Sequence, residues 1–328
     1  MNIVVTGATG GLGRSTLEFL SRFSSPGTFV TGTTRTLCRA PYIPGVLFRR
    51  ADFCVPESLD LAFAGASRVL IISSSSFDDD LRLAQHRNAI DACVRAGVER
   101  VYYTSLGICG KKEVTVSTLQ QTHLETEKMI KASNIPYTII REGIYAECFP
   151  LLLSWHPNTT SAILPGDGPI SFASRTELAE GTARLLLSDD LQYLNSTILL
   201  TGPSTFTFAE ITALIREIQG TPLTLEILPE DEYVRRIVAS RERPEWFAKS
   251  WASSFRAFSE GESGEVDLTL ETLLGRKPRG AEEVIRALLI EGKDNEEGGY
   301  TWHQNAKLRA IAKHTCIQAG VTIIIEKP

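Results

Sequence analysis

The segment that most constrains this chain is a glycine-rich turn near the N-terminus, where Thr6-Gly7-Ala8-Thr9-Gly10-Gly11-Leu12-Gly13 separates a short apolar run from a helical stretch. Gly7 permits a tight strand-to-helix turn, Gly10 lets the backbone approach a pyrophosphate, and Gly13 allows the helix to pack closely on the strand. The phosphates would then meet the N–H groups of the helix N-terminus. A plain glycine-rich turn is the alternative. We interpret the run as a dinucleotide site with these ligands: Gly7, Thr9, Gly10, Gly11, Leu12 and Gly13.

Short β-branched runs alternate with helical stretches over the first 150 residues, which is the pattern of consecutive βαβ units. The predicted strands occupy residues 3–5, 28–34, 46–49, 69–73, 100–105 and 136–141. Because several of these runs are apolar without strict alternation, we expect strands that are buried on both faces of a parallel sheet. The predicted fold class is therefore α/β, a Rossmann-type doubly wound parallel sheet.

The pattern changes after residue 150, and three regions are predicted. Residues 1–150 form the NAD(P)-binding Rossmann domain, to which a strand near 196–201 returns. Residues 151–290 form a smaller C-terminal α/β lobe over the substrate, and residues 291–328 form an atypical tail that begins with a polar, glycine-rich stretch. Trp246, Trp251 and Phe255 lie among basic residues, which suits either an amphipathic lid helix or a nucleic-acid-binding stripe. We favour the lid helix.

Composition and charge narrow the function classes. The 34 Lys and Arg residues against 39 Asp and Glu residues give a formal charge of −5, which does not favour a nucleic-acid partner. The six cysteines include no CxxC pair, so we expect no disulfide scaffold and predict a cytoplasmic location. No apolar run reaches the roughly 20 residues that span a bilayer, so no membrane is expected. No His and Cys spacing indicates a metal site.

The end of the second predicted strand indicates which dinucleotide binds. NAD sites usually end this strand with an acidic residue that holds the ribose 2′-hydroxyl, whereas Gly32-Thr33-Thr34-Arg35-Thr36 contains no acid and offers Arg35. A guanidinium suits the 2′-phosphate, so we expect NADP(H) to be preferred over NAD(H); an ordinary surface arginine is the alternative. Asp52, after the third strand, would either bond the adenine amino group or cap the helix that starts near Pro56.

Longer motifs along the chain carry a family resemblance. They are the glycine-rich turn, Ile72-Ser73-Ser74-Ser75, Gln85-His86-Arg87-Asn88, Tyr103-Thr104-Ser105-Leu106, His123-Leu124-Glu125-Thr126-Glu127-Lys128 and the segment from Tyr137 to Tyr145. From residue 1 to about 290 the chain resembles the NmrA-like atypical short-chain dehydrogenase/reductase family, and within it the type-2 NAD(P)H:quinone oxidoreductases. The resemblance implies an NADPH site facing a smaller lobe, and hydride transfer to acceptors such as quinones. It also implies cofactor contacts from Ser73, Ser74, Ser75, Thr104, Glu142 and Gly143.

The acid–base residues of ordinary short-chain dehydrogenases are missing. Those enzymes carry Tyr-x-x-x-Lys on a helix, and this chain has His123 and Glu127 at that place. Their spacing puts both on one helix face, where Glu127 could orient His123 or raise its pKa; a helix-surface pair is the alternative. Because histidine titrates near neutral pH, His123 is a candidate proton donor. Helix residues His86 and Arg87 are not predicted to be catalytic.

Two further candidates follow predicted strands, at the edge where open α/β sheets bind ligands. Ser105 and Tyr145 are expected to contact a quinone oxygen, although Tyr145 could equally be a buried packing residue. Between them, Glu142-Gly143 departs from the Asn-Gly that similar quinone reductases tend to carry. A carboxylate cannot donate a hydrogen bond to a quinone oxygen unless it is protonated, so the departure indicates a changed substrate.

The sequence therefore predicts an NADPH-dependent oxidoreductase that transfers hydride to a quinone or quinone-like aromatic molecule, such as an anthraquinone-type polyketide. The absent Tyr–Lys pair is tolerable, because hydride addition to a conjugated dione gives a stabilised anion that a weak acid can protonate. The alternative is a sensor that binds the dinucleotide and acts through a protein partner without turnover. A reductase needs an apolar acceptor pocket beside the nicotinamide, and a sensor does not. A homodimer is a candidate assembly.

Overall fold

The computed structural model describes residues 1–294 apart from 190, 221 and 242. Within them, the main sheet has seven strands, all parallel, in the order β3-β2-β1-β4-β5-β6-β8. The strands are β1 (Asn2–Val5), β2 (Phe29–Thr34), β3 (Val46–Arg50), β4 (Arg68–Ile72), β5 (Arg100–Leu106), β6 (Tyr137–Glu142) and β8 (Ser196–Leu200). The strand order reverses between β1 and β4, at the kind of switch point where doubly wound sheets bind ligands. The predicted Rossmann-type sheet is confirmed.

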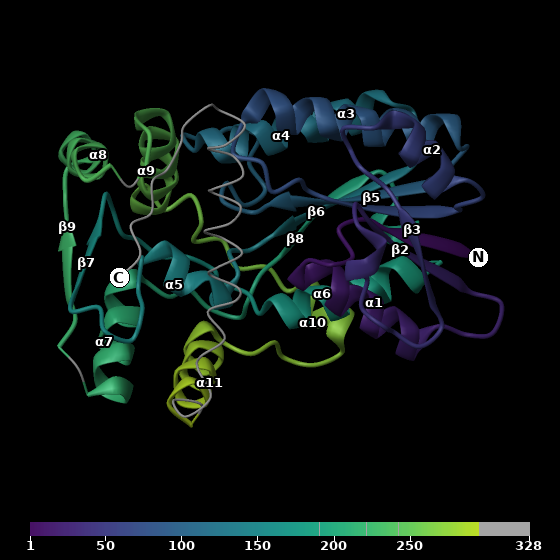
Figure 1. Cartoon of the computed structure of the whole chain (residues 1–328). Helices are drawn as coiled ribbons and strands as arrows, with labels where there is room; N and C mark the ends of the chain where they lie inside the picture. Colours follow the sequence, from purple (N-terminus) through teal and green to yellow (C-terminus); the bar gives the residue numbers. More distant parts are fainter. Residues whose placement is uncertain (190, 221, 242, 295–328) are drawn as a thin grey trace.

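Helices cover both faces of this sheet, as Figure 1 shows. One face carries α2 (Pro56–Phe63), α3 (Asp79–Arg95) and α4 (Thr118–Ala132); the other carries α1 (Gly11–Phe23), α6 (Arg175–Leu187) and α10 (Thr269–Leu274). Neighbouring strand residues supply the two cores alternately: Tyr103 packs in the cluster beneath α2, α3 and α4, whereas Tyr102 packs in the cluster beneath α1 and α6. This alternation explains the continuous apolar runs, because both faces of each central strand are buried.

The smaller lobe has its own two-stranded sheet and aromatic core. Its elements are β7 (Ser161–Leu164), β9 (Thr224–Ile227), α5 (Phe149–Leu152), α7 (Phe208–Gln219), α8 (Glu230–Ala239), α9 (Glu245–Ser259) and α11 (Ala281–Asp294). Short 3-10 turns cover Leu37–Arg39, Ala146–Cys148 and Leu191–Tyr193. Phe208 stacks on Phe255 with ring centroids 5.3 Å apart, and Phe258 packs against both. After residue 150 the chain contributes to both parts, since α6, β8 and α10 lie on the large sheet.

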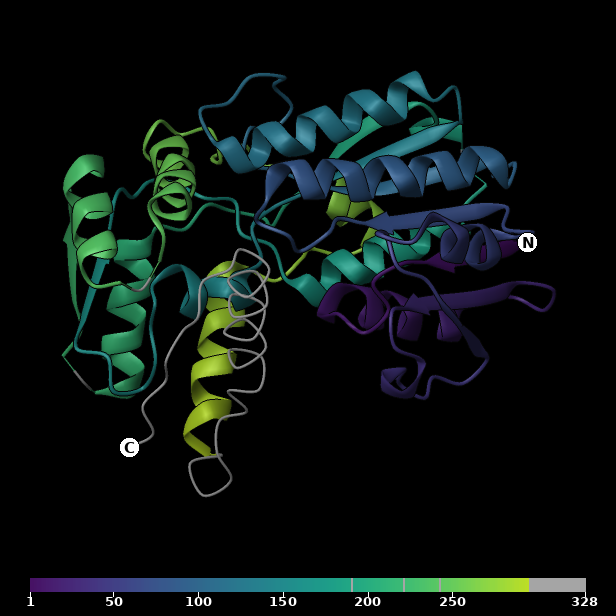
Figure 2. The same ribbon diagram turned by 45° about the horizontal axis from the view of Figure 1, so that its top comes forward.

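The two parts meet where α9 reaches the N-terminus of α4. The hydroxyls of Ser117 and Ser254 are 3.0 Å apart, and the Thr118 N–H donates to Ser253 Oγ at 3.0 Å. Figure 2 shows α3 and α4 lying side by side along the sheet, with the smaller lobe beyond their left-hand ends in this view. Since parallel strands β4, β5 and β6 all end toward this lobe, the junction lies over the ligand-binding edge of the sheet.

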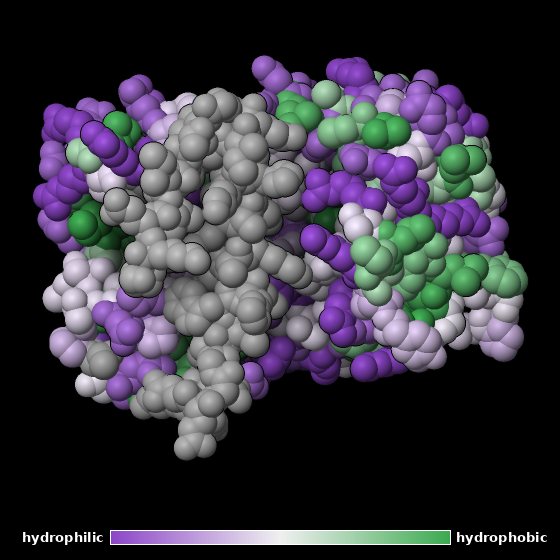
Figure 3. Space-filling view, in the orientation of Figure 1, coloured by the Kyte–Doolittle hydropathy of each residue, from purple (hydrophilic) through white to green (hydrophobic). Residues whose placement is uncertain are grey.

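The surface adds few constraints. A hydrophobic area lies over the purple N-terminal part of the ribbon (Figures 1 and 3). Exposed large hydrophobic residues among the first 50 include Phe29, Leu37 and Leu47. Among the described residues, no helix has both the length and the apolar character that a membrane crossing requires. Residues 291–294 continue α11, and the rest of the predicted tail lies outside the described residues.

Candidate cofactor and active site

The glycine-rich turn joins β1 to α1 through glycine-specific geometry. Gly7 has a φ of +63°, and the Gly10 N–H donates to the Gly7 carbonyl at 2.9 Å. A Cβ on Gly13 would lie 2.4 Å from that carbonyl oxygen, so only glycine allows the helix to begin this close to the strand. α1 starts at Gly11 after Gly10, which supplies no side-chain cap. Its first N–H groups therefore face outward at a positive helix end, which suits an anion.

Arg175, the first residue of α6, lies against this turn. A Cβ on Gly11 would be 2.7 Å from Arg175 Cζ, so the absent side chain of Gly11 leaves room for the guanidinium. The Arg175 backbone N–H is held by both Glu147 carboxylate oxygens at 3.0 Å. Its guanidinium forms no ion pair with a carboxylate in the part of the chain that the structure describes. Sequence reasoning gave Arg175 no role, although it adds a charge to the anion-binding turn.

The end of β2 carries the residues predicted to choose between dinucleotides. Arg35 is exposed directly after the strand, and the Thr34 hydroxyl bonds with the backbone of Thr36. Asp52 lies after the neighbouring strand β3, where Oδ1 accepts the Cys54 N–H at 2.9 Å. The helix α2 begins at Pro56 with no side-chain cap, so the predicted capping role of Asp52 is wrong. Its side chain closes a local turn instead, because the Cys54 N–H is nearer in the chain than any helix N–H.

The loop after β4 is fixed by neighbours on β5 and α3. The Ser73 N–H donates to Thr104 Oγ1 at 3.1 Å, and the Ser74 N–H donates to His86 Nε2 at 2.9 Å. The Ser74 hydroxyl donates to Gln85, while the Ser75 side chain is exposed. These contacts place the backbone of the loop at the edge of the sheet, beside the glycine-rich turn that follows β1.

His86 is a structural residue of this loop. Its Nδ1 lies 2.9 Å from Thr126 Oγ1, and the Thr126 hydroxyl donates to the Thr122 carbonyl at 3.1 Å. Nδ1 therefore carries the ring proton, and Nε2 accepts from Ser74. Burial, together with the charge of Arg82, lowers the pKa of His86 to about 3. A neutral ring is what these two hydrogen bonds require.

His123 is buried on α4, and it does not pair with Glu127. Its Nδ1 lies 2.9 Å from the Tyr103 hydroxyl, and Nε2 lies 3.2 Å from Arg82 Nη1. Because arginine only donates, Nε2 accepts. Burial and then Arg82 hold the pKa of His123 well below its usual value. The predicted help from Glu127 and the alternative of a surface pair are both wrong, since His123 faces α3 and β5 while Glu127 bonds elsewhere.

Glu127 belongs to a buried ion pair. Both of its oxygens accept from Arg141, at 2.9 and 2.7 Å, and Oε1 also accepts the Ser105 hydroxyl at 2.6 Å. Arg141 also donates to the carbonyls of Gly110 and Lys112. The group thus ties β5, β6 and α4 to the loop after β5. The Ser105 hydroxyl, which was predicted to contact the substrate, donates its hydrogen bond to Glu127 within this group.

Glu142 and Tyr145 form a second buried pair at the end of β6. The Tyr145 hydroxyl lies 2.5 Å from Glu142 Oε2, whereas Glu142 Oε1 has no hydrogen-bond partner among the described residues. Burial raises the pKa of Glu142 to about 8. The Gly143 N–H donates to the Leu200 carbonyl at 2.8 Å, which fixes the backbone just beyond the pair. The predicted site residues Tyr145, Glu142 and Gly143 are therefore brought together.

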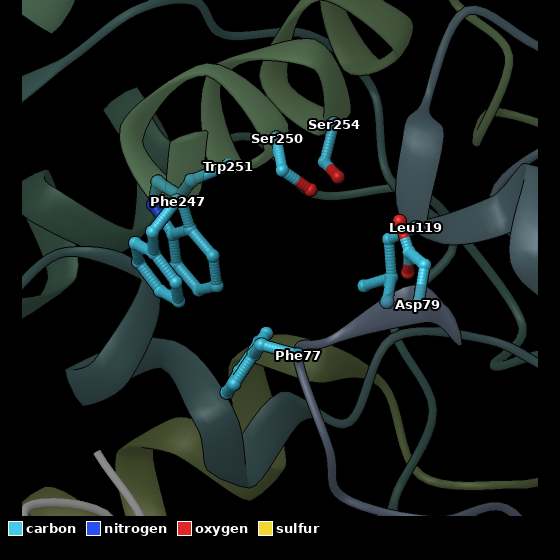
Figure 4. A pocket seen from close by; sticks show the side chains of 7 residues that line it. All are labelled: Phe77, Asp79, Leu119, Phe247, Ser250, Trp251 and Ser254. Carbon is cyan, nitrogen blue, oxygen red and sulfur yellow. The ribbon is translucent and has the colours of Figure 1, made fainter. Parts of the chain in front are cut away.

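A small aromatic cleft, with room for about one water molecule, lies between the two parts of the molecule. Figure 4 shows Phe247 and Trp251 on one side, with the hydroxyls of Ser250 and Ser254 pointing inward. The Phe77 and Phe247 rings are 5.0 Å apart and meet edge to face. Phe77 belongs to the loop that carries Ser73 and Ser74. The lining residues are Phe77, Asp79, Leu119, Phe247, Ser250, Trp251 and Ser254. In the part of the chain that the structure describes, no group of His, Cys, Asp and Glu side chains could hold a metal ion.

Comparison with known proteins decides the family, because residues 1–283 match the NmrA-like family. The chain belongs to the NmrA-like family. It is 36% identical over 311 residues to the NmrA-like family domain-containing oxidoreductase flvB of Aspergillus flavus, covering 93% of this chain and 98% of that protein. It is 31% identical over 279 residues to quinone oxidoreductase 2 of Escherichia coli, covering 83% and 93%. These relatives identify this NmrA-like protein as an NAD(P)H-dependent oxidoreductase.

Solved structures agree with this assignment. The NADPH complex of the Escherichia coli quinone oxidoreductase has a TM-score of 0.75 and 30% identity, covering 87% of this chain and 99% of that chain. Triphenylmethane reductase of Citrobacter sp., complexed with NADP(H), has a TM-score of 0.75 and 29% identity, with the same two coverages. The NmrA-like chain therefore shares its fold, over nearly the whole length of those chains, with two proteins that bind NADP(H).

Proposed function

We propose that this NmrA-like oxidoreductase transfers hydride from NADPH to a quinone or a quinone-like aromatic acceptor, such as an anthraquinone-type polyketide. The observation that carries the proposal is the combination, along one edge of the sheet, of an anion-binding glycine turn and an aromatic cleft. The quinone oxidoreductase among the relatives supports the acceptor class. Bound NADPH would supply the hydride, and the protein would supply position and electrostatics.

The residues present fit such a dinucleotide. The N–H groups at the start of α1 and the guanidinium of Arg175 offer donors and positive charge to a pyrophosphate. Gly7, Thr9, Gly10, Gly11, Leu12 and Gly13 form the turn, as the sequence predicts. Arg35 is exposed at the end of β2, where a 2′-phosphate would distinguish NADP(H) from NAD(H). The loop of Ser73, Ser74 and Ser75 is fixed by Thr104. It would contact the part of the cofactor that extends toward β5 and β6.

The acceptor would lie at the junction of the two parts, where Phe247 would have to move away from Phe77 to admit a ring. Phe77 comes from the cofactor-side loop, and Phe247 and Trp251 come from the smaller lobe, so aromatic surfaces from both parts meet. A flat conjugated ring stacks well on such surfaces. The hydroxyls of Ser250 and Ser254, which bond those of Thr118 and Ser117, line the same junction. Holding this acceptor against the hydride donor in a dry cleft is mainly positional catalysis.

The test is NADPH oxidation, followed at 340 nm, by the purified protein with a panel of benzoquinones, naphthoquinones and hydroxyanthraquinones. NADPH and NADH titrations are run beside it. We expect acceptor-dependent oxidation and tighter binding of NADPH. Tight NADPH binding without turnover on any acceptor would contradict the proposal and support the sensor alternative.

A further inference from the structure

Glu142 differs from the other buried carboxyl groups of the described residues. Glu127 pairs with Arg141, Glu177 with Arg276, and Glu180 with Arg184. Glu142 is 2% exposed, and no basic side chain in the described part of the chain lies within ion-pair distance of it. A buried carboxylate without a cation is costly, and such a group normally takes up a proton instead. The environment thus favours the neutral carboxylic acid.

Hydrogen bonds on both sides of Glu142 fix its position, and its side chain contacts Tyr145. Its backbone carbonyl accepts the Gly107 N–H at 2.8 Å, and the Gly143 N–H is bonded to β8, so both sides of the residue are fixed. Oε2 contacts the Tyr145 hydroxyl. Glu142 is fully buried, whereas Tyr145 is half-buried. Oε1 has no partner among the described residues. Tyr145 therefore connects the buried acid to the ligand-binding edge of the sheet.

We propose that Glu142, as a neutral carboxylic acid, and Tyr145 are the proton donor of this site, replacing the absent Tyr–Lys pair. The inference rests on the proposed function. Hydride addition forms a C–H bond on the acceptor and leaves an anionic oxygen. That oxygen takes the Tyr145 hydroxyl proton while the Glu142 proton passes to Tyr145 Oη, so an O–H bond forms and Glu142 becomes a carboxylate. Water then reprotonates it, and the two electrons are those that the proposed function assigns to NADPH.

Neighbouring groups do not compete for this role. Burial raises the pKa of the Cys148 thiol to about 11, and burial also holds the pKa of Tyr145 well above its usual value. An ionised Glu142 would add to the Tyr145 shift, whereas Arg175 opposes it. His123 is neutral and donates its ring proton to Tyr103. Glu142, with a pKa of about 8, is therefore the group that holds an exchangeable proton near neutral pH.

The protonation state is tested first by infrared spectroscopy of the protein without acceptor. We expect a protonated-carboxyl C=O band at pH 6.5 that disappears as the pH rises past about 8 and is absent in Glu142→Gln. Glu180→Gln, which alters a buried carboxyl paired with Arg184, is the matched control and should keep the band. A band that is absent from the wild type at pH 6.5, or that persists in Glu142→Gln, overturns the proposal.

Kinetics then test the donor role. We expect Glu142→Gln to lower kcat by about 10²- to 10⁴-fold with NADPH affinity retained, and to remove the fall in rate above about pH 8. Glu142→Asp should restore part of the rate, and Tyr145→Phe should match Glu142→Gln. Thermal melting confirms that each variant is folded. Wild-type kcat and pH profile in either folded variant overturns the proposal. If the infrared band behaves as expected but no acceptor is reduced, the proposed function fails and the donor role fails with it.

Discussion

At the scale of single residues, Arg35 and Arg175 should contribute to cofactor binding in different ways. Arg35 is exposed at the end of β2, where we propose that it meets the 2′-phosphate, the group that distinguishes the two dinucleotides. A charge-assisted hydrogen bond contributes about 1.5–3 kcal/mol, so Arg35→Ala should weaken NADPH binding roughly ten- to hundred-fold and leave NADH almost unchanged. Fluorescence titration of both dinucleotides measures this. Equal losses for both would remove Arg35 from the 2′-phosphate site.

Arg175→Ala should instead weaken both dinucleotides by a similar factor, since its guanidinium lies at Gly11, beside the helix end that the shared pyrophosphate would meet. Arg175→Lys should recover part of the affinity, because a point charge still attracts the phosphates without the planar fork. Arg14, an exposed α1 arginine paired with Glu18, provides the control: Arg14→Ala should change neither affinity. A loss confined to NADPH in Arg175→Ala would contradict this assignment.

These two arginines show what single residues reveal in a sequence. The place of Arg35 at the end of the second strand is a local feature, as are the glycines of the turn, and its role at the 2′-phosphate stays a prediction. The place of Arg175 could not be predicted, because only the packing of α6 on α1 brings it to Gly11. The predicted pairing of His123 with Glu127 was wrong for a related reason. Helix spacing places the two on a similar face, but Glu127 pairs with Arg141 and His123 with Arg82, which are distant in the sequence.

At the scale of elements, the Glu127–Arg141 pair should hold the sheet edge together. Both side chains are 1% exposed, and together with Ser105 they connect α4, β5 and β6. Removing one partner leaves a buried charge, so Arg141→Met should destabilise folding by about 3–5 kcal/mol. The double variant Glu127→Leu/Arg141→Met should cost much less than the sum of the single ones. Urea denaturation measures each; additive losses would contradict this account.

The helix α9 should influence which acceptor binds. Phe247→Ala removes an aromatic wall of the cleft, so KM should rise roughly tenfold for a three-ring acceptor and change little for benzoquinone, which has less surface to stack. The neighbouring Trp246 is 47% exposed and does not line the cleft, so Trp246→Ala is the matched control. Unchanged KM for every acceptor in Phe247→Ala would place the acceptor elsewhere.

Helices and strands could be predicted where the sequence pattern is periodic. Features that depend on contacts between the two parts of the molecule could not. The strands of the large sheet follow from apolar runs, and the glycine turn fixes the first βα connection. The cleft does not follow from any run, because Phe77 and Phe247 are far apart in the sequence. The amphipathic spacing of Trp246, Trp251 and Phe255 predicted a lid helix, and α9 contains all three residues. Its contact with the N-terminus of α4 depends on hydroxyl pairs such as Ser117 and Ser254.

At the scale of the whole molecule, the buried groups of the site should set the pH dependence of stability. His86 has a folded pKa of about 3 against 6.5 unfolded, so the unfolded chain binds the extra proton and stability falls as the pH drops below 6.5. Glu142 acts in the opposite sense. Its folded pKa of about 8 exceeds the unfolded 4.5, so the folded chain holds the extra proton and this stability is lost as the pH rises through that window.

Between pH 6.5 and 8 the unfolded forms of His86 and His123 lose their remaining half proton, while folded Glu142 stays protonated until the pH approaches 8. At about 1.4 kcal/mol per pH unit, the wild type should therefore lose roughly 1.5 kcal/mol of unfolding free energy relative to Glu142→Gln across this interval. Glu142→Gln keeps only the histidine contributions, so its stability should rise slightly, and Glu180→Gln should follow the wild type. Urea unfolding at pH 6.5 and 8 measures the difference. The same slope in the wild type and Glu142→Gln would mean that Glu142 is ionised in the folded protein, because a carboxylate that has already lost its proton contributes nothing to the slope over this range.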